Sequence, residues 1–221
     1  MERYVQIGKA NLKFNLYPHL LLSVLLLLLS PFLMGTQNLN ATRTAGVLEQ
    51  YVALLGILLL TPIFLPEQNK DIRDLVETKY TSSTAVTLIR LTEAVLSLAV
   101  LVGCYLLYLK YQNCTFPIMN YYLGTMAEAI FLGGMGLCAY SIFDQIAIAY
   151  MLPIMYYIMA LGGGRKLLKN FYPFSMRMGS YREKVFLAIT GIILILVGIS
   201  YPYIAKRYLP KLSWRFGRQK V

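Results

Sequence analysis

Long apolar runs are the feature that most constrains how this chain folds. A helix needs roughly 20 apolar residues to cross the hydrocarbon core of a bilayer. Because 57% of the residues are hydrophobic, well above a soluble domain, the chain is expected to be an all-α polytopic membrane protein. Six segments are long and apolar enough to predict transmembrane helices: 17–34, 46–65, 86–109, 121–143, 145–161 and 185–205.

These segments predict one transmembrane domain over residues 1–205, followed by a basic tail at 206–221. Only Ser141–Gln145 separates the fourth and fifth segments. A tight hairpin is the simplest interpretation, and one long bent helix is the alternative.

Charge suggests how the helices are oriented. Six helices place both termini on one side, and Lys and Arg collect in cytoplasmic loops. With both termini inside, 13 of the 21 Lys and Arg residues would be cytoplasmic and 8 outside. We therefore predict a multi-pass plasma-membrane protein with cytoplasmic termini. The loop 162–184 would lie outside although it is basic. The net charge of +11 is interpreted as topological, so no nucleic-acid partner is expected.

Familiar catalytic signatures are missing from the sequence. The glycine run that starts at Gly162 lacks the spacing of a phosphate-binding loop and is expected to end the fifth helix. His19 is the only histidine, so a zinc-protease motif is impossible. We therefore predict no enzyme activity, no metal site and no cofactor in this chain.

Several ionisable residues fall in or near the apolar runs: Glu49, Arg90, Glu93, Glu128 and Asp144. Such residues are costly in lipid and usually face the protein interior or a water-filled path. Arg90 and Glu93 are three residues apart and could pair. Alternatively, Arg90 reaches the interface and Asp144 caps the fifth helix. A polar contact inside the bundle is predicted for Glu93 and Glu128, serving either transport or packing.

A charged segment at about 66–85 separates the second and third apolar runs. Ile72, Leu75, Val76 and Lys79 recur at helical spacing, and most charges lie on the other side. This pattern predicts a short amphipathic cytoplasmic helix that docks on a soluble partner.

The layout resembles that of a known family. Six helices, a short N-terminal segment and an amphipathic helix after the second membrane helix resemble the permease subunit of type-2, exporter-class bacterial ABC transporters. The run Pro62–Lys79, continuing to Ile89–Leu91, is similar to versions found in such permeases, as are Phe174–Met176 and Glu183-Lys184.

This resemblance implies a coupling helix that docks on a separate ATPase subunit, which would hold ATP and Mg. The coupling residues it implies are Glu67, Gln68, Asp71, Ile72, Leu75 and Val76. It also implies an interfacial helix at about Glu2–Tyr17 and a re-entrant element within 162–184. The partners would be the ATPase, a second permease subunit in a homo- or heterodimer, and membrane lipid.

The implied function is export of peptide, antibiotic or lipid-like cargo. Two alternatives remain open at this point. One is a non-transporting accessory or immunity membrane protein, and the other is a small channel.

Overall fold

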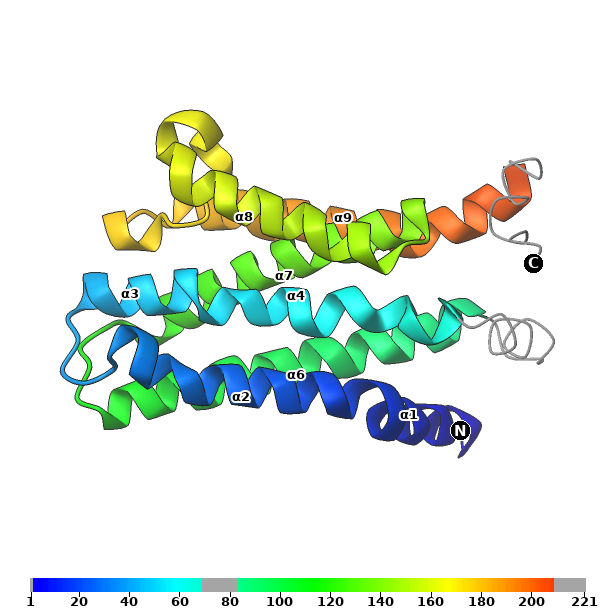
Figure 1. The fold of residues 1–221 in the computed structure, drawn as a ribbon, viewed down its shortest axis with the longest axis horizontal. Coiled ribbons are helices and arrows are strands. Elements are labelled where there is room, and N and C mark those ends of the chain that lie inside the picture. The colour runs from blue at the N-terminus through cyan, green and yellow to red at the C-terminus, as the bar shows by residue number, and fades with distance from the viewer. Residues whose placement is uncertain (1, 69–82, 209–221) are drawn as a thin grey trace.

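A computed structural model describes residues 2–68 and 83–208 of the chain. The described part is almost entirely helical and has no strand. Six of its helical segments are long and apolar enough to cross a membrane, so the protein is a multi-pass membrane protein, as predicted. Successive spans run in opposite directions along the long axis of the molecule, which is horizontal in Figure 1.

The described residues form eight α-helices and five short 3-10 or π-helical segments. In chain order, the elements are α1 (Glu2–Asn11), η1 (Leu12–Leu16), α2 (Tyr17–Met34), α3 (Ala41–Gln50), η2 (Val52–Leu54), α4 (Leu55–Leu60), η3 (Thr61–Gln68), α6 (Ser83–Tyr111), α7 (Ile118–Phe143), α8 (Ile146–Leu168), η4 (Lys169–Phe171), η5 (Met176–Met178) and α9 (Arg182–Tyr208). Most of the amphipathic helix predicted at about 66–85 falls in residues 69–82, outside the described residues.

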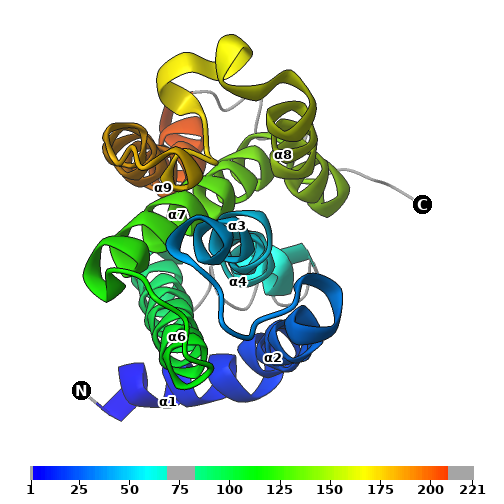
Figure 2. The same cartoon turned by 90° about the vertical axis from the view of Figure 1, so that its left-hand side faces the viewer.

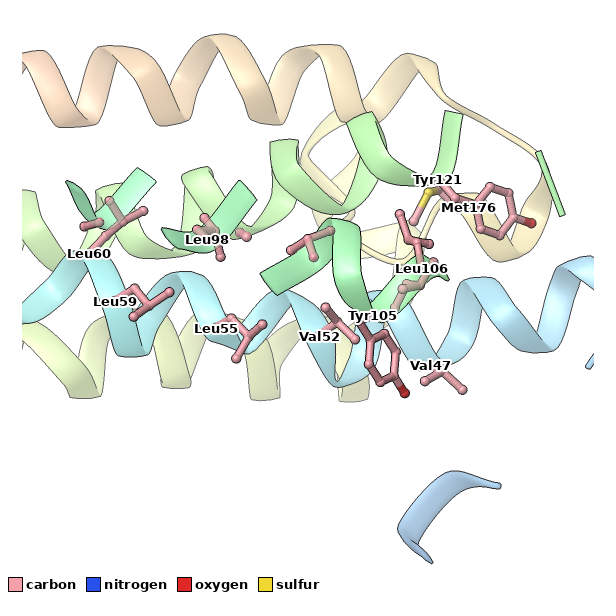
Figure 3. Close-up of a cluster of buried hydrophobic side chains, with 14 of the residues drawn as sticks. Val47, Val52, Leu55, Leu59, Leu60, Leu98, Tyr105, Leu106, Tyr121 and Met176 are labelled. Atoms are coloured by element: carbon pink, nitrogen blue, oxygen red, sulfur yellow. The ribbon is translucent and has the colours of Figure 1, made fainter. Parts of the chain in front are cut away.

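The second and fourth spans form the centre of the bundle. The most apolar stretches of Ala41–Pro66 and Ile118–Phe143 are 78% and 72% buried, whereas the other four are 17–33% buried. The outer four spans therefore leave most of their apolar surface exposed on the outside of the bundle. Leu55 and Leu59 of α4 pack beside Leu98 of α6 in the main core cluster (Figure 3).

Small residues allow α4 and α7 to touch backbone to backbone. A Cβ atom added at Gly56 of α4 would lie 1.9 Å from the carbonyl oxygen of Ala129 on α7. At Gly133 it would lie 2.4 Å from the carbonyl oxygen of Gly56. Only glycine leaves room for this approach, which is typical of helix packing in membranes.

A tight turn joins α7 to α8. Asp144 ends α7 in the left-handed conformation, with φ of 52°, and Gln145 is extended before α8 begins. The predicted hairpin is therefore confirmed, and the single bent helix is wrong. Asp144 ends the fourth span rather than capping the fifth.

Two helix boundaries differ from those predicted by more than three residues. The second span begins at Ala41 instead of residue 46, because the Asn40 side chain accepts a hydrogen bond from the Arg43 backbone N–H and caps the new helix. The fifth span runs through the glycine run to Leu168, with a kink at Gly164, where φ is +60°.

The N-terminal helix lies across one end of the bundle instead of along it (Figure 2). α1 packs on α6, and the π-helical turn η1 bends the chain into α2. We call this end the α1 end. η3 finishes there and α6 begins there (Figure 1). The loop between α8 and α9, residues 172–181, lies at the opposite end and is called the α8–α9 loop below.

Candidate functional site

Three ionisable side chains from three different spans meet inside the bundle near the α8–α9 loop. The Lys184 ammonium of α9 lies 2.8 Å from Glu49 Oε1 of α3 and 2.5 Å from Glu128 Oε2 of α7. The Lys184 side chain is 4% exposed and both carboxylates are 0% exposed. We call Glu49, Glu128 and Lys184 the charge cluster.

The charge cluster holds the α8–α9 loop against the bundle. Glu49 Oε1 accepts a hydrogen bond from the Met176 N–H at 2.7 Å, and Oε2 accepts one from the Arg177 N–H at 3.3 Å. Lys184 also donates to the carbonyl oxygen of Pro173. The backbone of the loop is therefore part of the cluster, since it supplies both donors and an acceptor.

Loop side chains also pack into the bundle. Phe174 and Met176 are 3% and 2% exposed. Met176 lies against Gly124 of α7, where an added Cβ would come within 2.4 Å of its sulfur. The ring of Phe174 meets Tyr157 of α8 and Tyr172 edge to face. The loop thus buries apolar side chains in the same end of the bundle where its backbone contacts the charge cluster.

Two tyrosines of the loop stay neutral beside the cluster. Burial raises the pKa of Tyr181, and the Glu49 carboxylate raises it further. The pKa of Tyr172 is raised mainly by burial and then by Glu49 and Glu128, against a smaller opposite effect of Arg177. Both phenols therefore add no charge at neutral pH.

A second ion pair lies beside the charge cluster and nearer to water. Arg165 of α8 pairs with Glu183 of α9 at 2.5 Å, and the Ser180 hydroxyl donates to the same carboxylate. The Arg165 side chain is 50% exposed. Glu183 and Lys184 are adjacent in sequence but pair with different residues. Glu183 pairs with the half-exposed Arg165, and Lys184 pairs with the two buried carboxylates.

A separate polar contact lies at the α1 end. Glu93 of α6 accepts a hydrogen bond from the Asn11 side chain at 2.7 Å, which ties α1 to the bundle. Arg90 is 7% exposed and donates to the carbonyl oxygen of Ile63 at 3.3 Å, so its side chain is buried against η3. A small cavity beside them is lined in part by Asn11, His19 and Arg90.

The predicted polar residues therefore fall into two groups at opposite ends of the molecule. Glu49 and Glu128 come together, while Arg90 and Glu93 lie near α1. Sequence reasoning assigned Lys184 to a loop and did not recognise it as their common partner. Glu67 and Gln68 end η3 at the α1 end. The other four predicted coupling residues, Asp71, Ile72, Leu75 and Val76, lie outside the described residues.

No protein-family model matches the chain, and no curated protein and no solved structure matches it.

Proposed function

We propose that this chain is the membrane-spanning permease subunit of an ATP-driven exporter, and that a separate ATPase subunit supplies the energy. The observation that carries the proposal is that α1 shares one end of the bundle with the end of η3 and the start of α6 (Figure 1). The charged segment 66–85 therefore joins the bundle beside a helix that lies across its end. A soluble ATPase could contact both elements there.

The opposite end of the molecule supports the same proposal. The α8–α9 loop folds back onto the bundle and buries Phe174 and Met176. This is the kind of re-entrant element that the resemblance to type-2 exporters implies for this position. The loop seals the end of the bundle that would face away from the ATPase.

The central helices offer a mechanical route between the two ends. Movement of the coupling segment would act first on η3, which continues directly from α4. α4 contacts α7 backbone to backbone at Gly56. α7 carries Glu128, which is paired to α9 through Lys184. Closure of two ATPase subunits on ATP would thus reach the loop end through packed, rigid elements.

In this proposal, both termini and the segment 66–85 face the cytoplasm and the protein lies in the plasma membrane. A second permease subunit, identical or related, would complete the path, while lipid would cover the remaining apolar surface of the outer spans. The cargo would be a peptide, an antibiotic or a lipid-like molecule.

The test is a charge placed in the proposed docking contact. In the helix predicted for the coupling segment, Leu75 lies on the apolar side and Thr81 on the opposite side. We would express the tagged chain in its native host and measure co-purification of an ATPase and ATP-dependent transport. Leu75→Asp should reduce both at least tenfold, because an unpaired charge would enter an apolar contact. Thr81→Asp, which adds the same charge, should change neither by more than about twofold.

Normal ATPase binding and transport by Leu75→Asp would refute the docking site. A chain that binds no ATPase at all would support the accessory or immunity protein. Ion conductance by the purified chain in liposomes, without ATP, would support the small channel.

A further inference from the structure

The charge cluster contains one oxygen without a donor. Lys184 has three acceptors, namely Glu49, Glu128 and the Pro173 carbonyl, which match the three N–H groups of an ammonium. Glu49 accepts from Lys184 and from two backbone N–H groups. Glu128 accepts from Lys184 through Oε2 only, and no donor within the described residues reaches its buried Oε1.

The cluster also holds more negative than positive charge. Two carboxylates face one ammonium, so the three side chains would carry a net charge of −1 if all were ionised. Lys184 has an acceptor for each N–H group, and both oxygens of Glu49 have donors, whereas one oxygen of Glu128 has none. The excess negative charge is therefore assigned to Glu128. A buried charge without full pairing is strongly unfavourable, most of all in a membrane-spanning helix.

The surrounding elements do not offset this charge. The phenols of α8 and of the loop that interact electrostatically with Glu128 are neutral groups: Tyr156, Tyr157 and Tyr172. Tyr121 of α7 and Tyr181 interact with Glu49 and are neutral too. Arg177 gives its backbone N–H to Glu49, but its side chain is exposed. Glu183 is already paired with Arg165.

We propose that Glu128 is a proton-binding site. The carboxylate takes one proton from water and forms an O–H bond at Oε1, while Oε2 continues to accept from Lys184. The cluster then has no net charge, with Glu49 ionised, Lys184 protonated and Glu128 neutral. This inference does not rest on the exporter function, because it follows from the charges and contacts of the cluster alone.

The proposal has a consequence that a merely structural cluster would not show. The bound proton neutralises the second of two carboxylates that share one ammonium, whichever of the two glutamates holds the proton. Replacing Glu49 by Gln removes that surplus and leaves Lys184 paired with a single carboxylate. Glu128 should then be ionised, although it has not itself been changed.

Infrared spectroscopy tests this directly. The protein would be labelled with glutamate carrying ¹³C at the side-chain carboxyl, reconstituted in potassium-free and sodium-free lipid nanodiscs at pH 7, and compared with the same sample in D₂O. We expect one deuterium-sensitive carboxylic-acid C=O band in the wild type. It should be lost in Glu128→Gln, lost in Glu49→Gln and kept in Glu93→Gln, the matched change at the α1 end.

The infrared spectrum of the wild type alone can refute the proposal, so the test does not depend on whether a variant folds. Absence of the band at pH 7 would mean that Glu128 is an ionised carboxylate and that no proton is bound. A band that vanishes on adding sodium or potassium chloride at fixed pH would identify a metal cation as the resident ligand and refute the proton. A band that persists in Glu128→Gln would assign the proton to another residue.

Discussion

Replacing Lys184 tests how much the charge cluster contributes to folding. Lys184→Met keeps an unbranched side chain of similar length, so the change mainly removes charge and hydrogen bonds. At an effective dielectric constant of about 20, two unit charges 2.8 Å apart attract by about 6 kcal/mol. Desolvation of the ions offsets part of this, and breaking a buried pair by removing one partner typically costs about 3–5 kcal/mol. We expect a loss of that size.

Arg165→Met is the matched control for this experiment. Arg165 also pairs with a glutamate at 2.5 Å, the same distance as Lys184 and Glu128, but its side chain is 50% exposed instead of 4%. Exposed ion pairs contribute about 0–1 kcal/mol. The assay is equilibrium unfolding of the purified protein in mixed micelles, followed by circular dichroism.

The two variants must therefore differ in their free energy of unfolding by at least about 2 kcal/mol. Equal losses would show that burial does not govern the strength of these pairs and would refute the reasoning. As a second check, adding Glu49→Gln to Lys184→Met should recover part of the loss, because it removes the ionised carboxylate left without its cation.

Two further predictions concern topology and packing. Single cysteines at Gln68 and Gln112, in a background without the native cysteines, should react with an impermeant reagent from opposite sides of the membrane; reaction from the same side would contradict the alternating arrangement of the spans. Gly56→Ala should destabilise the protein by about 1–3 kcal/mol or prevent folding, because the new methyl group would meet α7 backbone, whereas Gly162→Ala, with nothing within 4 Å, should be neutral in the same unfolding assay.

Hydropathy predicted the number of spans well, since each span must be apolar over its own length. The predicted 17–34 is the observed α2, Tyr17–Met34. Helix ends were harder to place, because a cap such as Asn40 or a kink such as Gly164 depends on local geometry that average hydropathy does not capture.

The site could be predicted only in part. Glu49 and Glu128 stood out because a carboxylate in an apolar run is costly and needs a partner. Their partner did not stand out, because Lys184 lies at the edge of its apolar run and next to Glu183, like an ordinary loop residue. The contact between Lys184 and Glu128 spans 56 residues of sequence, and only the packing of α7 on α9 brings them together.

The position of Lys184 also bears on how the chain is made. Of the three helices that carry the cluster, the ribosome makes α3 first, then α7 and finally α9. Glu49 and Glu128 are therefore synthesised well before Lys184, the only buried cation that pairs with them in the described structure. Until α9 enters the bilayer, both acids must stay neutral or remain shielded by the insertion machinery. Arrival of α9 therefore completes the charge balance of helices already in place, and a chain truncated before Arg182 lacks the group that stabilises its two central spans.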